Sequence, residues 1–177
     1  CYSAETSVKA SNRKCEQNLL AAEKFSVMAE KLCGMEYPRK KLNKAWKTLL
    51  FNQFHDILPG TSIHEAMEMT REEYVEMNEL GNGLLSTAVE HLNKNVNVTT
   101  DGIIVWNFNS MPVTGTVIVE MNLDNAKIVD ENGNEIAARE VFGPAVEGSE
   151  YNVSDKRNVV IDGYTFSGVE GDDVTGI

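Results

Sequence analysis

The sequence predicts an α+β fold, in which an antiparallel three-helix bundle is followed by a portion of an antiparallel β-sandwich. Residues 1 to about 95 are rich in Ala, Leu, Glu, Lys and Met, which favour helices, whereas the rest is rich in Val, Ile, Asn, Gly and Thr. Apolar residues recur at helical spacing in the first part and at every second position in the second. We therefore expect a helical domain over residues 1–95 and a β domain over 96–177.

The first helix is predicted from Val8 to Leu32. Apolar or small side chains recur there at helical spacing and would form its buried stripe: Val8, Cys15, Leu19, Ala22, Ala29 and Leu32. Gly34 follows this stripe, and glycine is the residue that most readily ends a helix.

The second helix is predicted to begin after Pro38 and to end before Pro59, because a residue that precedes proline disfavours helical geometry. At roughly 100° per residue, His55 falls nearly opposite the apolar stripe and in line with Phe51. We therefore expect the His55 ring to point away from the bundle, beside an outward aromatic side chain, and to be covered by a surface outside the bundle. The stripe itself would consist of Leu42, Ala45, Trp46, Leu49 and Leu50.

The third helix is predicted to open at Ser62, whose hydroxyl would form a capping box with Glu65. Gly81 and Gly83 interrupt the apolar pattern of this helix. Three amphipathic helices with short connections favour an antiparallel bundle. The buried stripe of the third helix would consist of Ile63, Met67, Thr70, Tyr74, Met77, Leu84, Ala88 and Leu92.

The second part of the chain alternates apolar and polar residues, which predicts half-buried antiparallel strands. Asn132-Gly133 predicts a hairpin turn between two of them. We interpret this region as the opening strands of a larger β domain. One strand face would carry Ile104, Trp106 and Phe108, and another would carry Val117, Val119 and Met121.

The charge and hydropathy of the chain exclude two classes of partner. A formal net charge of -11 opposes binding to nucleic acid, because affinity for phosphate backbones comes from Lys and Arg. The sequence contains no long uncharged apolar run, so we expect no membrane partner. The chain starts at Cys1, without an initiator methionine or a leader, and we expect it to be part of a longer polypeptide.

The three cysteines, Cys1, Cys15 and Cys33, include no Cys-x-x-Cys pair. Neither a disulfide framework nor a thiolate zinc site is predicted from this spacing. We expect reduced core cysteines, which favour a cytoplasmic location over a lysosomal, Golgi or secreted one.

His55 and Asp56 are the candidate functional residues, because an imidazole can bind a metal and a carboxylate can accept hydrogen bonds from hydroxyl groups. Asp56 is expected in the last turn of the second helix, where the negative end of the helix dipole opposes it. Unfavourable local choices of this kind are typical of functional sites. A lone exposed histidine is nevertheless more often a plain surface residue than a ligand.

The other two histidines and the basic residues of the second helix have simpler interpretations. His64 is expected to be solvated or to cap the third helix. His91 is expected to be structural, since a cation suits the C-terminal end of a helix. A solvated helix face is expected for the basic run Arg39, Lys40, Lys41, Lys44 and Lys47.

The stretch from Trp46 to Ile63, WKTLLFNQFHDILPGTSI, is similar to glycoside hydrolase family 38 over many consecutive positions. Upstream, Tyr2-Ser3 and the run from Glu16 to Glu23 resemble the entry to the family's helical middle domain, together with Lys9 and Asn12. Downstream, IIVWNFNSMPVTGTV (103–117) resembles the first strands of its C-terminal β domain, although Val113 stands where the family often has arginine. Within the central stretch the matching residues include Gln53, Phe54, His55, Asp56, Pro59 and Gly60.

The resemblance implies a retaining α-mannosidase with an N-terminal barrel-like catalytic domain, a three-helix middle domain and a large C-terminal β domain. Residues 1–95 would be the middle domain, and 96–177 would be the N-terminal part of the C-terminal β-sandwich domain. The substrate would be an α-mannoside or oligosaccharide, and the chain's own N-terminal catalytic domain would be its partner. A homo-oligomer is left open.

The resemblance also implies roles for three residues. His55 would be a zinc ligand, Asp56 would contact sugar hydroxyls, and Phe54 would pack at the edge of the site. A second histidine and two aspartates on the catalytic domain, one of them the nucleophile, would complete the zinc site. No catalytic residue is expected in this chain, which alone should be inactive and bind zinc weakly.

Two alternatives stay open at this point. The protein could be a mannosylglycerate hydrolase of the same family, because the helical segment does not show which leaving group is accepted. It could instead be a non-catalytic carbohydrate-binding or interaction module, in which the His55-Asp56 segment is only a folding element.

Overall fold

A computed structural model describes residues 5–97, 102–120, 127–130, 132–142 and 157–166 of the 177 residues. The chain forms two compact units, residues 1–99 and 100–177. The first is helical and the second contains the strands.

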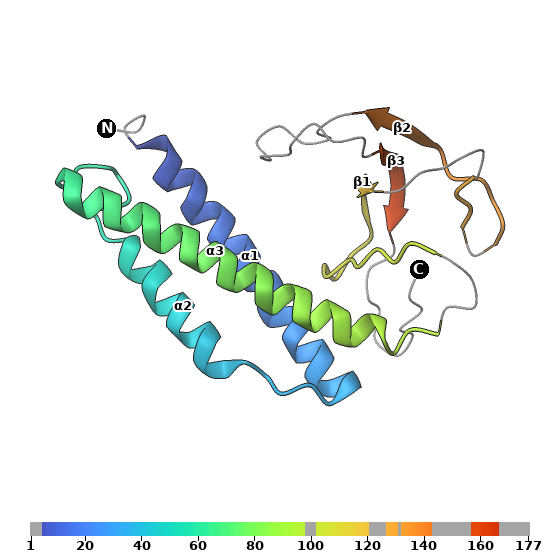
Figure 1. The fold of residues 1–177 in the computed structure, drawn as a ribbon, viewed down its shortest axis with the longest axis horizontal. Coiled ribbons are helices and arrows are strands. Elements are labelled where there is room, and N and C mark those ends of the chain that lie inside the picture. Colours follow the sequence, from blue (N-terminus) through green and yellow to red (C-terminus); the bar gives the residue numbers. More distant parts are fainter. Residues whose placement is uncertain (1–4, 98–101, 121–126, 131, 143–156, 167–177) are drawn as a thin grey trace. The chain divides into compact units, whose positions relative to one another are not determined.

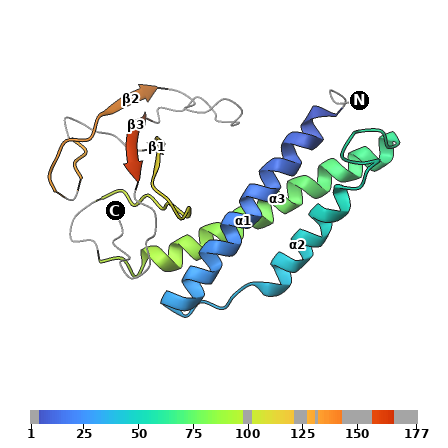
Figure 2. The ribbon, with the colours of Figure 1, turned by 180° about the vertical axis from the view of Figure 1, so that it is seen from behind.

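The first unit is a three-helix bundle, formed by α1 (Thr6–Cys33), α2 (Arg39–Asn52) and α3 (His64–Asn93). Helices α1 and α3 run side by side in the same direction, and α2 runs opposite to both (Figures 1 and 2). This direction agrees with the hydrogen bonds between α1 and α3, which join Cys15 to Tyr74 and Asn18 to Asn82. The predicted antiparallel bundle is confirmed.

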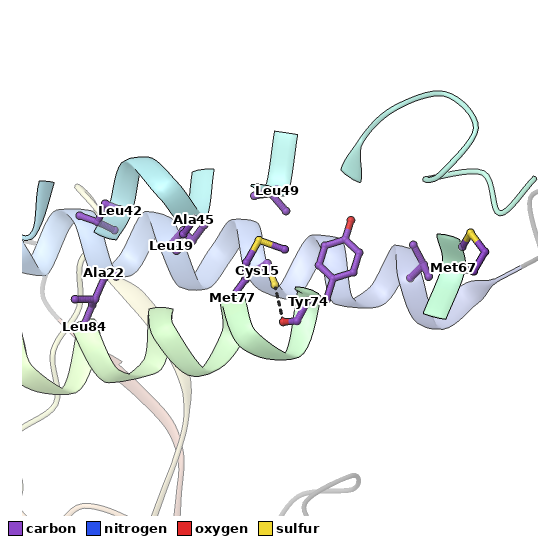
Figure 3. Packing of buried hydrophobic residues seen from close by; sticks show 11 residues of the cluster. Cys15, Leu19, Ala22, Leu42, Ala45, Leu49, Met67, Tyr74, Met77 and Leu84 are labelled. Atoms are coloured by element: carbon purple, nitrogen blue, oxygen red, sulfur yellow. Dashed lines mark hydrogen bonds between the residues drawn. The ribbon is translucent and has the colours of Figure 1, made fainter. Parts of the chain in front are cut away.

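The core of the bundle lies along the predicted stripes, as Figure 3 shows. Near its middle, the Cys15 thiol donates to the Tyr74 carbonyl oxygen at 3.6 Å. Burial raises the pKa of the Cys15 thiol to about 11, so the thiol is protonated at neutral pH. Both Cys15 and the half-buried Cys33 are free thiols, whereas Cys1 lies outside the described residues. The core cluster consists of Val8, Cys15, Leu19, Ala22, Leu42, Ala45, Leu49, Met67, Tyr74, Met77 and Leu84.

Three residues assigned to these stripes are exposed instead: Leu32, Leu50 and Ile63. Leu32 lies in the last turn of α1, which extends past the start of α2 (Figures 1 and 2). Leu50 directly follows the buried Leu49 and is therefore rotated by about 100° from it. Ile63 precedes α3 and is not part of the helical stripe.

The end of α1 and the start of α3 can be compared with the predictions made from the sequence. Gly34 ends α1 as expected, with a φ of 69°, and its N–H donates to the Glu30 carbonyl oxygen. The capping box at Ser62 is wrong, because α3 is preceded by Ile63, which makes no side-chain cap. Glu65 then lies two positions after the cap rather than three, which is too close to form a capping box.

Gly81 belongs to the buried stripe of α3 rather than interrupting it. It faces Asn18 of α1, whose Nδ2 donates to the Asn78 carbonyl oxygen at 3.1 Å and to Asn82 Oδ1 at 2.9 Å. A Cβ atom at Gly81 would lie 2.9 Å from Asn18 Nδ2, closer than real Cβ contacts allow. The absence of a side chain at Gly81 therefore leaves room for the Asn18 amide between α1 and α3.

The second unit contains a three-stranded antiparallel sheet in the order β1 (Val113–Glu120), β3 (Arg157–Phe166) and β2 (Ala138–Phe142). Val117 pairs with the buried Ile161, and the register shifts between Gly115 and Val117. The predicted half-buried face of Val117 and Val119 is confirmed, whereas Met121 lies outside the described residues. The β-sandwich stays a prediction.

The strand predicted around Ile104, Trp106 and Phe108 is wrong, because residues 102–112 belong to no strand. The Asn107 side chain donates to the Met111 carbonyl oxygen at 3.0 Å and accepts from the Asn109 backbone N–H at 3.0 Å. Local hydrogen bonds of this kind compete with the pairing of a strand.

A turn at the predicted Asn132-Gly133 is confirmed, although it closes an isolated bridge rather than joining two of the named strands. Gly133 has a φ of 83°, and Val129 pairs with Glu135 across the turn. Hydrogen bonds from Asn134 to the Asp130 carboxylate lower the pKa of Asp130 and tie the two sides together.

The basic run of α2 is solvent-exposed, as predicted for a solvated helix face. No helix among the described residues has both the length and the hydropathy needed to span a membrane.

The contact at Gly81 generates a test of the bundle. Gly81→Leu should lower the free energy of unfolding by about 2 kcal/mol, because the new side chain displaces Asn18 and overpacks the helix contact. Gly83→Leu is the matched control, since a Cβ there meets no atom within 4 Å. This control should raise stability by about 0.5 kcal/mol through helix propensity. Urea unfolding followed by circular dichroism measures both, and equal effects at the two positions would contradict the close contact.

Candidate functional site

The predicted site residues Phe54, His55 and Asp56 lie in the turn that joins α2 to α3. Helix α2 ends at Asn52, so the prediction that Asp56 lies in its last helical turn is wrong. The N–H groups of Gln53 and Phe54 donate to carbonyl oxygens three residues back, at 3.3 and 3.1 Å, which tightens and ends the helix. We call residues 53–60 the site turn.

Polar side chains explain why the helix ends several residues before Pro59. Gln53 Nε2 donates to Asn12 Oδ1 at 3.2 Å and to Glu16 Oε1 at 2.8 Å, both on α1. The Tyr74 hydroxyl on α3 also donates to Asn12 Oδ1, at 3.2 Å. Burial raises the pKa of Tyr74, which keeps this hydroxyl protonated at neutral pH. We call Asn12, Glu16, Gln53 and Tyr74 the polar network.

The neighbouring Asn52 makes a similar contact, with α3 in place of α1. This side chain is fully buried, and its Nδ2 donates to Glu73 Oε2 of α3 at 2.7 Å. The last residue of α2 is thus bonded to α3, and the next residue is bonded to α1. The entry to the site turn is therefore fixed from two directions.

The later part of the site turn is also attached to the bundle. Lys9 Nζ of α1 donates to the Pro59 carbonyl oxygen at 3.3 Å, and the Ile57 side chain is 9% exposed. Gly60 has a φ of 81°, a left-handed conformation that glycine adopts without strain, before the chain enters α3. Thr61 Oγ1 donates to the Asp56 carbonyl oxygen at 3.3 Å.

Between these attachments, the three predicted site residues are brought together on the surface. The His55 side chain is 77% exposed and that of Asp56 is 58% exposed, with 3.6 Å between His55 Nε2 and Asp56 Oδ2. The rings of Phe54 and His55 lie 4.2 Å apart between centroids, tilted by 51°. The expected outward exposure of His55 is confirmed, and so is that of Phe51.

The turn offers one imidazole rather than a complete metal site. Among the described residues, no group of three or more His, Cys, Asp and Glu side chains could hold a metal ion. His64 Nε2 lies 3.2 Å from Glu68 Oε1 on α3, and His91 Nδ1 lies 2.9 Å from the Thr87 carbonyl oxygen near the end of that helix. The exposed His55 ring has the chemistry of a single ligand to a metal whose other ligands lie elsewhere.

The polar network was not predicted, although the sequence carries a signal for it. Asn12 lies four residues after Val8 and three before Cys15, so the spacing of the buried stripe includes it. A buried asparagine needs hydrogen-bond partners. Gln53, two positions before His55, is the residue that supplies one.

The Alpha mannosidase middle domain family model matches residues 1–92, and the MucBP domain model matches residues 125–177. Among curated proteins, Alpha-mannosidase 2C1 of Mus musculus is 36% identical over 92 residues, which are 51% of this chain and 9% of that protein. Alpha-mannosidase G of Dictyostelium discoideum is 38% identical over 68 residues, which are 38% of this chain and 6% of that protein. The matched segment thus spans less than a tenth of either relative.

Two solved structures share the fold. A protein of glycosyl hydrolase family 38 from Enterococcus faecalis matches with a TM-score of 0.65 and 22% identity, over 94% of this chain and 23% of that chain. An alpha-mannosidase from Enterococcus faecalis V583 matches with a TM-score of 0.67 and 22% identity, over 90% of this chain and 21% of that chain.

The polar network generates a test of its own. Asn12→Ala should lower the free energy of unfolding by about 2 kcal/mol, because Gln53 and Tyr74 each lose the acceptor Asn12 Oδ1 inside the bundle. Gln17→Ala removes an exposed amide from the same helix and should change stability by less than about 0.5 kcal/mol. Thermal and urea unfolding of both variants measure the difference, and an Asn12→Ala variant as stable as the Gln17→Ala variant would show that the network contributes nothing.

Proposed function

This chain belongs to the alpha mannosidase middle domain family, and we propose that it is part of a retaining glycoside hydrolase that cleaves α-mannosidic bonds. The observation that carries the proposal is the site turn itself. It presents an exposed imidazole, a carboxylate and an aromatic ring side by side at the end of a bundle, within the matched segment. Its substrate would be an α-mannoside or oligosaccharide.

In this proposal, His55 is one ligand of a zinc ion that is shared with the protein's own N-terminal catalytic domain. The exposed His55 ring would supply one metal ligand, because no described neighbours would complete a metal site around it. When bound, zinc would act as a template and Lewis acid for two hydroxyls of the sugar. The nucleophile and the acid/base carboxylate would lie on the catalytic domain, about 5 Å apart as retention requires.

Asp56 and Phe54 would contact the substrate. An ionised carboxylate accepts hydrogen bonds from hydroxyl groups, and that of Asp56 is more than half exposed. Phe54 presents an exposed aromatic face beside the His55 ring, suited to the apolar face of a sugar at the edge of the site.

The proposal extends to the rest of the chain. Residues 1–95 would form the middle domain, and 96–177 would be the N-terminal part of a C-terminal β-sandwich domain that includes the sheet of β1, β2 and β3. The free thiols of Cys15 and Cys33 favour a cytoplasmic location.

The role of His55 is tested in the full-length protein. His55→Ala should lose bound zinc and reduce turnover of an aryl α-mannoside by about a hundredfold or more, since an outer-sphere change alone can cost 10–100-fold. His64→Ala is the matched control, because it removes an equally exposed imidazole from the first turn of α3. Metal content by atomic emission and initial rates are the measurements. A His55→Ala protein with full zinc and full turnover would contradict the role of His55 as a zinc ligand, whereas a full-length parent with neither bound zinc nor turnover would favour a non-catalytic module.

The 177-residue chain alone should not hydrolyse aryl α-mannosides, with or without added zinc. The physical reason is that both catalytic carboxylates are assigned to another domain, so that no nucleophile faces the substrate. Release of the aryl group measured by absorbance, with the full-length protein as the positive control, checks this. Turnover by the purified chain would contradict the division of the site between domains.

A further inference from the structure

We propose that Gln53 is a positioning residue, whose hydrogen bonds to α1 fix the site turn so that His55 and Asp56 are presented in one arrangement. This inference rests on the proposed function, because it assumes that His55 binds zinc. It assigns no contact between Gln53 and the metal or the substrate.

The first support is the chemistry of the Gln53 amide. Its Nε2 carries two hydrogens, and the two contacts it makes are both to acceptors, Asn12 Oδ1 and Glu16 Oε1. A carboxylate of the same length would place an acceptor against two acceptors. An apolar side chain would leave the half-buried Glu16 and the buried Asn12 short of a donor.

The second support is that one face of α1 holds both ends of the turn. Lys9, Asn12 and Glu16 are spaced by three and four residues and therefore lie on the same side of the helix. Asn12 and Glu16 bind Gln53 at the entry, and Lys9 binds the Pro59 carbonyl oxygen at the exit.

The third support is the short distance along the chain between the anchor and the proposed ligand. His55 follows Gln53 by two residues, and the intervening Phe54 N–H is bonded to the Phe51 carbonyl oxygen. The backbone therefore has little freedom between the fixed amide and the imidazole. A side-chain change at Gln53 should reach His55 through this segment, because a metal ligand tolerates only small displacements.

The experiment exchanges donor and acceptor in the full-length protein. Gln53→Glu should weaken zinc affinity by at least about tenfold and lower kcat/KM similarly, because two carboxylates would then face each other. The double variant Gln53→Glu with Glu16→Gln restores a donor and an acceptor between positions 53 and 16, and should recover part of both losses, because Asn12 Oδ1 still faces a carboxylate. Glu16→Gln alone should weaken zinc affinity less than Gln53→Glu does, because the new amide can rotate so that its oxygen accepts from Gln53. Zinc affinity is measured in chelator-buffered zinc, apart from the rate assays.

Three further variants separate positioning from general stability. Arg13→Ala removes the exposed partner of Glu16, at 3.1 Å, and should leave zinc affinity unchanged. Leu84→Ala should lower the unfolding temperature through loss of core packing, yet also leave zinc affinity unchanged. If Gln53→Glu does not fold, Gln53→Ala replaces it, and is expected to weaken zinc affinity more than Leu84→Ala does.

The outcomes distinguish this inference from the proposed function. Parent-like zinc affinity in Gln53→Glu, or no recovery in a folded double variant, would overturn the positioning role. In that case loss of zinc in His55→Ala would still support the proposed function. Retention of zinc in His55→Ala would overturn the proposed role of His55 as a zinc ligand, on which this inference rests.

Discussion

The two hydrogen bonds that Gln53 donates to Asn12 and Glu16 are the constraint on which the geometry of the site turn depends. A buried polar group left without a partner costs about 1–3 kcal/mol, which is a large share of the stability of a small domain. Asn12 Oδ1 accepts hydrogen bonds from both Gln53 and Tyr74. Because these donors come from the end of α2 and from α3, the turn can occupy its position only when all three helices are packed.

This coupling explains how a small bundle presents a rigid surface segment. Helix α1 runs beside α3 in the same direction (Figure 2), and Gly81 leaves room for the Asn18 amide between them. The same helix directs Lys9, Asn12 and Glu16 to the two ends of the site turn. Between those ends only Ile57 is buried, and the chemically active side chains of His55 and Asp56 are left exposed. Packing energy from the apolar core thus supports a polar, outward-facing segment.

Sequence periodicity predicted the three helices and most of the core, because apolar side chains at intervals of three and four residues must lie on one face. It placed the end of α2 too late, since it relied on Pro59 as the stop and had no means of weighing the contacts of Asn52 and Gln53 with other helices. The strand around Trp106 failed for a related reason, because hydrogen bonds of Asn107 bend the chain locally. The exposed triad of Phe54, His55 and Asp56 was found by its resemblance to a family motif, whereas the network beneath it depends on tertiary contacts between distant positions.

Amide hydrogen exchange in the site turn tests the central claim most directly. The N–H groups of Phe54, Ile57, Leu58 and Gly60 all donate to backbone carbonyl oxygens within or just before the turn. If the polar network fixes this segment to the bundle, these amides should exchange about as slowly as those in the middle of α1 and α3, and opening should require the helices to separate. Exchange at the rate of an unstructured peptide, while α1 and α3 stay protected, would show that the turn moves independently and would contradict the account.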